Sequence, residues 1–263
     1  MKLGLKSKIL IVVLLLVVVL AFVSFYNYQQ KALTVLAYHS VMLEAKEKNA
    51  PYSISEAVFV EQMEYLKTAG YHVVSMQDAI TGLQGQRELP TKPLVLTFDD
   101  GYKDNFYIAW PILQRYDYPA TVFVATSLLA TEGFMTWQDI KAAHDDGIHF
   151  ASHTINHKAL GKLPADEVRF ELAQSKRLFK DNVNIDIEYL AYPFGSYNEA
   201  MFPILEETGY KAAFTGNLGT SSHKTKLYEL ERVNIVQQTG YYQFRVKLLA
   251  AQVIGWLKYL VQF

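Results

Sequence analysis

No cysteine occurs among the 263 residues of the chain, and this absence limits both its stabilisation and its chemistry. Disulfide bonds are excluded, and any metal site must use histidines and carboxylates because no thiolate is present. The chain also has no large excess of charge of one sign, since it contains 25 Lys and Arg and 26 Asp and Glu residues. A polycationic nucleic-acid binder is therefore excluded, and an apolar fraction of 51% is too high for a disordered chain.

One long hydrophobic run is present, close to the N-terminus. Residues 9–26 are apolar at every position except Ser24, and Lys2, Lys6 and Lys8 precede them. The run lies near the lower limit of about 17–25 residues for crossing a bilayer and exceeds the roughly 7–15 apolar residues of a cleavable signal. No small-residue cleavage site follows it. We predict an uncleaved anchor; a cleaved signal, which would give a secreted protein, and a buried core helix are the alternatives.

The lysines before the run predict, by the positive-inside rule, a single-pass protein of the cell membrane whose later residues lie outside the cell. This outer part carries 22 basic and 26 acidic residues, a net charge of −4, because the first 30 residues hold three lysines and no acid. It has no basic patch, so nucleic acid is not an expected partner.

After the run, short apolar segments alternate with longer amphipathic ones, a pattern typical of βα units around a mostly parallel sheet. The expected strands are Leu33–Tyr38, His72–Ser75, Pro93–Phe98, Thr121–Ala125, Ile148–Ala151, Ile187–Tyr192 and Ala212–Thr215. Helical periodicity appears in Glu56–Thr68, Asn105–Arg115, Trp137–Asp145, Ala165–Lys180 and Glu199–Thr208. Seven strands with intervening helices favour an incomplete barrel over an open sheet, with long loops at 41–54 and 216–226.

We divide the chain into three parts. Residues 1–30 form a cytoplasmic stub and membrane anchor, residues 31–240 form one α/β domain, and residues 241–263 form a C-terminal amphipathic helix. The only charged residues of that helix are three basic ones. It would either dock on the α/β domain or lie in the membrane interface.

Two acids follow one of the expected strands. Asp99 and Asp100 come directly after Pro93–Phe98 and before Gly101, at the rim where α/β domains place their chemistry. Their side chains leave the backbone in different directions, so one can bind a metal while the other faces the water of that metal. An Asp-Asp-Gly turn with a helix N-cap is the purely structural alternative.

Two histidines follow another expected strand, Ile148–Ala151. His153 and His157 are four residues apart, a spacing that puts both on one side of a helical turn. Histidines in surface turns are ordinary, so the pair alone is weak evidence. Together with an acidic pair at an equivalent strand end, two histidines and one carboxylate make the composition of a catalytic zinc-type site with an open position.

These segments resemble a known family. Thr97–Gly101 and Ser152–His157 look like the first two motifs of the polysaccharide deacetylase family, the NodB-homology carbohydrate esterases, and Ala191–Gly195 is similar to its third motif. The resemblance covers about residues 33–235. It implies an α/β fold of the distorted (β/α)7 barrel type, here preceded by an N-terminal transmembrane helix.

The resemblance also implies roles for individual residues. Asp99 is expected to be the general base, and Asp100, His153 and His157 are expected to bind one divalent metal ion. Zinc is the first expectation, and nickel or cobalt also suit two histidines and one carboxylate.

The third motif is expected to build one wall of the substrate groove. Tyr192, Pro193 and Phe194 would contact the substrate or its oxyanion, the latter through a backbone N–H near Phe194. Tyr102, just after the Asp-Asp-Gly turn, and the aromatic rings of the third motif would stack on sugar faces.

Three features of the family are missing here. Ala191 stands where many members have an arginine that pairs with the catalytic base. A fourth motif, Asp-x-x-Asp-Trp, is absent. A fifth, a Leu-x-His that supplies the general acid, is also absent, because His223 is the only histidine after His157 and lies in a polar run.

We expect the missing groups to come from elsewhere in the chain. His39 ends the first strand, and a barrel brings the ends of its first and last strands together, so we predict that His39 is the general acid. A strand-end histidine with only a local hydrogen bond is the alternative. Arg232 could replace the lost arginine beside Asp99. The alternative, which the sequence leaves equally open, is that Arg232 is exposed on the surface.

The early Tyr-His pair resembles the branch of the family that deacetylates poly-β-1,6-N-acetylglucosamine. We therefore expect a metal-dependent hydrolase that releases acetate from N-acetylglucosamine units of an extracellular polysaccharide, first of all the poly-N-acetylglucosamine of biofilms. A peptidoglycan or chitin-type deacetylase is one alternative, and a non-catalytic surface glycan-binding protein is another. We expect a monomer.

Overall fold

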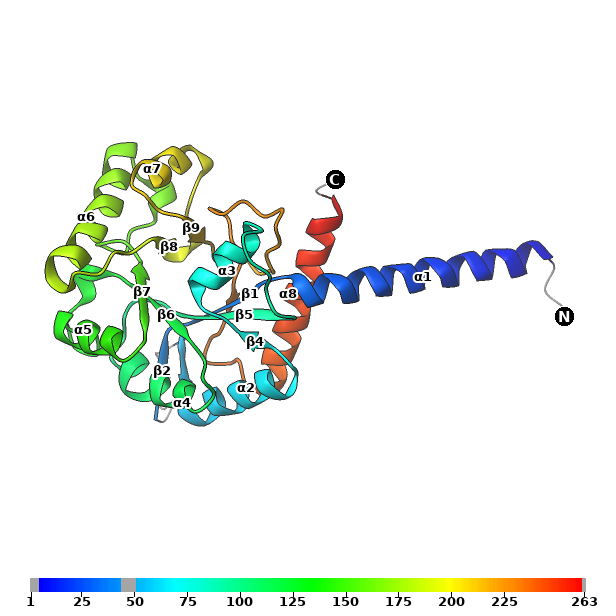
Figure 1. Ribbon diagram of the computed structural model, residues 1–263, viewed down its shortest axis with the longest axis horizontal. Helices are drawn as coiled ribbons and strands as arrows, with labels where there is room; N and C mark the ends of the chain where they lie inside the picture. Colours follow the sequence, from blue (N-terminus) through cyan, green and yellow to red (C-terminus); the bar gives the residue numbers. More distant parts are fainter. Residues whose placement is uncertain (1–4, 44–50, 262–263) are drawn as a thin grey trace.

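Seven parallel strands form the centre of the computed structural model, which describes residues 5–43 and 51–261 (Figure 1). The strand order is β10-β1-β5-β6-β7-β8-β9, and the short strand β4 pairs with β5 outside this path. The strands of this sheet are β1 (Thr34–Tyr38), β4 (His72–Val73), β5 (Pro93–Phe98), β6 (Ala120–Val124), β7 (His149–Ser152), β8 (Tyr189–Ala191), β9 (Ala212–Phe214) and β10 (Val233–Asn234). Strands β2 (Ser40–Met42) and β3 (Ser53–Ser55) form a separate parallel pair.

The sheet curls into a half-barrel. Strand β1 pairs with β10 on one side and with β5 on the other. Just before β10, Leu230 makes a parallel bridge to Phe214 at the end of β9. The segment 230–234, which includes the outer strand β10, thus also approaches the other outer strand, β9. The predicted incomplete α/β barrel is confirmed.

Helices connect the strands and cover the outside of the half-barrel (Figure 1). They are α2 (Glu56–Thr68), α3 (Met76–Leu83), α4 (Trp110–Gln114, which continues a π-helical turn at Asn105–Ala109), α5 (Trp137–Asp145), α6 (Ala165–Val183) and α7 (Phe202–Glu207). Short 3₁₀ turns occur at Thr126–Leu128, Leu160–Lys162, Pro193–Gly195 and Glu199–Met201. The local sequence determines where several helices begin. Ser55 and Ser75 are the N-caps of α2 and α3, and Thr136 with Asp139 forms a capping box at the start of α5.

The N-terminal helix α1 (Leu5–Lys31) runs away from the sheet and leads directly into β1 (Figure 1). Its most apolar stretch has a mean hydropathy of 3.2, and none of that stretch is buried. Among the described residues it is the one helix long and apolar enough to cross a membrane. The alternative of a buried core helix is therefore wrong. Lys2 lies outside the described residues.

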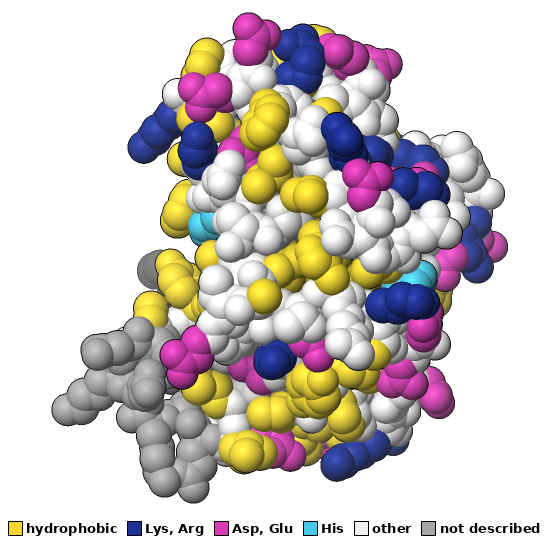
Figure 2. Space-filling model, turned by 90° about the vertical axis from the view of Figure 1, so that its left-hand side faces the viewer, with side chains coloured by type: hydrophobic (Ala, Val, Ile, Leu, Met, Phe, Trp, Pro, Cys, Tyr) yellow, Lys and Arg dark blue, Asp and Glu magenta, His cyan; other side chains and the backbone are white. Residues whose placement is uncertain are grey.

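The C-terminal helix α8 (Tyr241–Val261) packs against the base of α1 and against α2, so it docks on the α/β domain. Residues 262–263 and much of the expected loop 41–54 lie outside the described residues. Viewed from the end opposite α1, the surface of the molecule carries charged side chains of both signs among hydrophobic ones (Figure 2).

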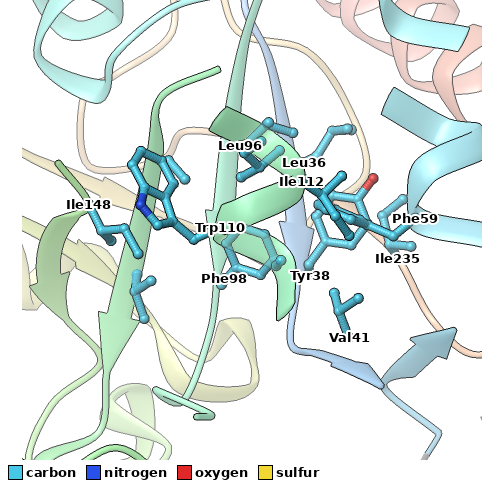
Figure 3. Packing of buried hydrophobic residues seen from close by; sticks show 14 of the residues in the cluster. Leu36, Tyr38, Val41, Phe59, Leu96, Phe98, Trp110, Ile112, Ile148 and Ile235 are labelled. Atoms are coloured by element: carbon cyan, nitrogen blue, oxygen red, sulfur yellow. The ribbon is translucent and has the colours of Figure 1, made fainter. Parts of the chain in front are cut away.

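Aromatic packing fixes the ends of the neighbouring strands β1 and β5 (Figure 3). Tyr38 and Phe98, the last residues of β1 and β5, lie with ring centroids 5.5 Å apart, and Phe59 of α2 packs against both. The hydroxyl of Tyr38 donates to Gln62 at 2.8 Å, so its burial leaves no unpaired polar group. The residues that follow these two strands therefore start from fixed positions.

Candidate active site

Polar side chains gather at the carboxyl ends of the parallel strands, at the rim that the sequence predicts. His39 follows β1, Asp99 and Asp100 follow β5, and His153 follows β7. Parallel strands end at the same edge, so three segments that are distant in sequence meet there. The chain turns sharply after β5, because Asp100 has a φ of 75° and Gly101 a φ of 91°. This left-handed conformation is common for glycine, is tolerated by short polar side chains such as aspartate, and is rare for other residues.

Three possible metal ligands converge at this rim. The Nε2 atom of His157 lies 3.3 Å from Oδ1 of Asp100 and 3.2 Å from Nε2 of His153. The third separation, from Nε2 of His153 to the same oxygen of Asp100, is 3.6 Å. A tetrahedral ion with bonds of about 2.1 Å would hold its ligands about 3.4 Å apart.

An orphaned atom supports the same interpretation. Oδ1 of Asp100 is buried and has no hydrogen-bond partner among the described residues. Burial also raises the pKa of Asp100 to about 6. An unpaired buried carboxylate oxygen is costly, and a cation beside it would remove that cost. The residues present therefore fit a divalent metal ion.

The hydrogen bonds around the histidines set which ring nitrogen faces the other ligands. Nδ1 of His153 lies 2.8 Å from the carbonyl oxygen of Ala191, so it carries the proton and leaves Nε2 with a free lone pair. Burial lowers the pKa of His153 to about 3 and also lowers the pKa of His157. Both rings are therefore neutral, as metal ligands must be.

Asp99 does not join this group of ligands but forms a buried ion pair. One of its oxygens accepts a hydrogen bond from Nη1 of Arg232 at 2.7 Å, and both side chains are almost fully buried. Nε of Arg232 donates to the carbonyl of Thr215 at 3.0 Å. Arg232 thus lies beside Asp99 rather than on the surface, and the exposed alternative is wrong.

The ion pair controls the charge of Asp99. Burial alone would raise the pKa of this carboxyl, but the positive charge of Arg232 and its hydrogen bond to the carboxylate outweigh burial. The pKa of Asp99 is therefore well below its ordinary value, and the group stays ionised at neutral pH.

His39 lies at the same rim, as predicted. Its ring stacks on Tyr52 with centroids 4.7 Å apart, and its buried Nδ1 has no hydrogen-bond partner in the described part of the chain.

Asp104 and Asn105 hold the segment of His39 in place, and the sequence analysis did not single them out. The Nδ2 atom of Asn105 donates to the carbonyl of His39 at 2.6 Å. Asp104 accepts from the hydroxyl of Ser40 at 2.5 Å and from the backbone N–H of Val41 at 3.2 Å. An acid just before a helical pattern looks like an ordinary N-cap, so nothing in the sequence marked these long-range contacts.

The third motif contributes less than expected. The side chain of Tyr192 is fully buried, stacks on Tyr197 and donates to the carbonyl of Tyr228, so its expected stacking on a sugar is wrong. The ring enters the core because it directly follows a buried strand. Pro193 is buried as well. Phe194, by contrast, is 75% exposed and presents its ring to that of His157 at a centroid distance of 4.6 Å.

Tyr102 lies at the rim and packs face to face on Phe134, with ring centroids 4.5 Å apart. Burial and the nearby acids Asp100 and Asp104 raise the pKa of its hydroxyl to about 12. The group is thus neutral at physiological pH and can donate a hydrogen bond. Phe134 was not among the expected site residues.

A buried glutamate on α6 supports the loop between the two histidines. One oxygen of Glu171 accepts from the backbone N–H groups of Ile155 and Asn156 at 2.9 and 3.0 Å, and the other accepts from the side chain of Asn156 at 2.7 Å. The sequence itself indicates that Glu171 is buried. Glu171 falls between Val168 and Leu172 on the apolar stripe of its helix, where an acid needs buried partners.

Comparisons with known proteins agree with this geometry. The family profile described as Polysaccharide deacetylase matches residues 86–213. YxkH of Bacillus subtilis (strain 168), named as a polysaccharide deacetylase, is 30% identical over 203 residues, which span 77% of this chain and 71% of YxkH. The poly-beta-1,6-N-acetyl-D-glucosamine N-deacetylase of Escherichia coli (strain K12) is 26% identical over 260 residues, covering 82% of this chain and 38% of that protein.

A solved structure shows the same fold. The Streptococcus pyogenes deacetylase PplD, in complex with acetate, aligns with a TM-score of 0.75 and 27% identity. The alignment covers 85% of this chain and 99% of that one.

Proposed function

The chain belongs to the polysaccharide deacetylase family, hydrolases that act on amide bonds, and on that premise we propose that it removes acetyl groups from the N-acetylglucosamine units of an extracellular polymer. One arrangement carries the proposal: Asp100, His153 and His157 present three ligand atoms 3.2–3.6 Å apart, beside an Asp99 that Arg232 keeps ionised.

Asp100, His153 and His157 would hold one divalent ion, zinc in the first place and nickel or cobalt as alternatives. Such an ion supplies a more acidic water and polarises the carbonyl of the acetamide. The proton of that water would pass to the carboxylate of Asp99, whose low pKa is maintained by Arg232.

The remaining steps fall to groups around this centre. His39 would donate a proton to the leaving amine, because an amide anion is a prohibitive leaving group. A backbone N–H near Phe194 would donate to the carbonyl oxygen as negative charge develops there. The exposed ring of Phe194 and the ring of Tyr102 would contact the faces of the sugars.

We propose poly-β-1,6-N-acetylglucosamine as the polymer. The support is the name of the Escherichia coli relative and the position of His39 at the end of the first strand, where it supplies the acid that the missing fifth motif would otherwise provide. The acetate bound to PplD has the chemistry of the released product.

The proposal includes a location and a division of the chain. Residues 1–30 would form the stub and the anchor, with α1 crossing the cell membrane, and the domain 31–240 would lie outside the cell. The helical segment 241–263 would form the third part.

The test is acetate release by the full chain in lipid nanodiscs on poly-N-acetylglucosamine, chitin oligomers and peptidoglycan. We expect release from the first polymer that stops with a chelator and returns with added zinc. Asp99→Asn and His39→Ala should each lower the rate by about 10²–10⁴-fold. The control His72→Ala, an exposed histidine on β4, should keep the full rate.

Each proposal can fail separately. Faster release from chitin or peptidoglycan would reject the proposed polymer, and glycan binding without acetate under any divalent metal would reject catalysis. Full activity of His39→Ala would reject only its role as the acid.

A further inference from the structure

The C-terminal helix α8 holds the base of α1 against the half-barrel. Trp256 packs edge-on against Phe25 with ring centroids 5.4 Å apart, and its indole N–H donates to Ser24 at 3.2 Å. Tyr28 and Tyr259 lie with centroids 5.3 Å apart. On the side toward the half-barrel, α8 buries a set of small and apolar residues, namely Phe244, Leu248, Ala251 and Gly255.

The opposite side of α8 is apolar and uncovered. Its exposed hydrophobic side chains are Tyr242, Val246, Leu249, Leu257 and Leu260, with exposures of 39–75%. With Val253, these positions repeat every three or four residues and therefore form one stripe along the helix. We call these six residues the α8 stripe. A helix that is apolar on its outer face as well as its inner one needs a second apolar partner.

The charges of α8 indicate the chemistry of that partner. The helix contains Arg245, Lys247 and Lys258 and no acidic residue. Lys258 pairs with Glu231 and Lys247 donates to the carbonyl of Asn234, so Arg245 is the basic residue of α8 that lies beside the stripe. A recess of about 520 Å³ lies beside the stripe, lined by Lys92 and Arg245 together with Tyr242, Val246 and Leu249. Basic groups next to an apolar stripe complement an anionic headgroup above acyl chains.

The position of α8 relative to α1 agrees with such a partner. The contacts of α8 fall on Ser24, Phe25 and Tyr28, at the end of the apolar run 9–26. An 18-residue run spans about 27 Å, close to the hydrocarbon thickness of a bilayer. If α1 crosses the membrane, these contacts lie at its outer boundary. Figure 1 shows α8 lying across the base of α1 at that level.

We propose that the α8 stripe lies in the outer leaflet at the boundary between headgroups and acyl chains and binds anionic phospholipid. This inference rests on the proposed function, in which α1 is a membrane anchor. The occupant of the stripe is thus the same membrane that α1 crosses.

Binding of the α8 stripe to the membrane would determine which way the candidate active site faces relative to the bilayer. Helix α1 joins the amino end of β1, and the ligands lie at the carboxyl ends of the parallel strands. A five-residue strand spans about 17 Å, so the ligands lie about that far from the amino end of β1, on the side of the sheet away from α1 and the bilayer. The rim at the carboxyl ends of the strands would therefore meet a polymer already clear of the membrane.

The absence of cysteine permits a direct test with the full chain. Single variants Leu14→Cys, Val246→Cys, Leu249→Cys and Phe170→Cys are labelled with an environment-sensitive fluorophore and reconstituted in vesicles of phosphatidylcholine and phosphatidylglycerol. Doxyl-labelled lipid then quenches labels by depth. Phe170 on α6 is 56% exposed, like Leu249 at 54%, and serves as the matched control. Labelled variants are first checked for unchanged acetate release.

We expect quenching at positions 14, 246 and 249 to exceed that at position 170 by about threefold or more, because an interfacial helix sits about 5–10 Å into the boundary. Unquenched labels at 246 and 249 beside a quenched label at 14 would overturn the docking but keep the anchor. An unquenched label at 14 would overturn the anchor, and the docking with it. Equal quenching at 246 and 249 in phosphatidylcholine alone would overturn the anionic preference.

Discussion

At the scale of single residues, the buried pair of Asp99 and Arg232 gives the clearest prediction. Arg232→Gln should lower the free energy of unfolding by about 3–5 kcal/mol, because it leaves a buried carboxylate without its partner. It should also reduce acetate release by at least about 10²-fold, since the pKa of Asp99 would rise and the carboxylate would lose its position. Urea unfolding and initial rates measure the two effects.

Arg169→Gln is the matched control for Arg232→Gln. Arg169 is 41% exposed and pairs with Glu207 and Asp166 at the surface, where ion pairs contribute about 0–1 kcal/mol. If both arginine variants behaved alike, the special role of Arg232 would be wrong.

The turn after β8 allows a second prediction at this scale. Phe194 and Gly195 have φ angles of 58° and 63°, and a Cβ on Gly195 would lie 2.7 Å from the backbone nitrogen of Gly216. Gly195→Ala should therefore destabilise the fold by about 1–3 kcal/mol and raise the KM, because the exposed ring of Phe194 would shift. Gly133→Ala is the control, since φ is 84° there but no atom lies within 4 Å of the added Cβ. Equal losses in the two variants would contradict a steric cause.

Motifs that are local in sequence were predictable, and contacts between distant segments were not. The candidate ligands Asp100, His153 and His157 follow the ends of recognisable strands, so their meeting follows from parallel topology. For Arg232 the sequence left two positions open, beside Asp99 or on the surface, because the residues around it do not show which side chain it contacts. Tyr192 was misassigned because a position next to the active rim does not determine whether a side chain points into the core.

At the scale of elements, helix α6 controls the loop that carries the second histidine. Glu171→Gln would place an amide where a carboxylate now accepts three hydrogen bonds. We expect metal affinity to fall by about 10–100-fold, as when a group that orients a metal ligand is removed. Competition with a chromophoric chelator measures the affinity.

Glu167→Gln, on the same helix, is the control for Glu171→Gln. Glu167 makes only an exposed contact with Lys158, 3.5 Å away, so its loss should leave metal affinity unchanged. Unchanged affinity in Glu171→Gln as well would show that the loop does not depend on this buried carboxylate.

The expected elements were mostly right where periodicity was long. The helices Glu56–Thr68 and Trp137–Asp145 have the predicted bounds. Strand β10 has two residues and no apolar run, so it exists only through its pairing with β1. Helix α3 escaped prediction because its eight residues are too few for a clear period, although Ser75 marks its start.

At the scale of the whole molecule, helix α1 and the α/β domain share a packed interface. Composition alone predicted a membrane segment and a separate outer domain, but it could not show that the last turns of α1 pack against α8. Tyr28 is buried, its hydroxyl lies 3.0 Å from that of Thr220, and Phe25 packs on Trp256. The end of α1 is thus part of the folded structure rather than a flexible tether.

This interface predicts different stabilities for two truncated chains. A fragment of residues 21–263 keeps Phe25 and Tyr28, whereas a fragment of residues 32–263 loses both and uncovers Trp256. We expect the longer fragment to be more stable by about 2–4 kcal/mol, the scale for burying one or two aromatic side chains. Urea unfolding of both fragments in the same mild detergent measures the difference. A longer fragment with Phe25→Ala and Tyr28→Ala should fall to the level of the shorter one, whereas equal stability of the two unmodified fragments would show that α1 adds nothing to the fold.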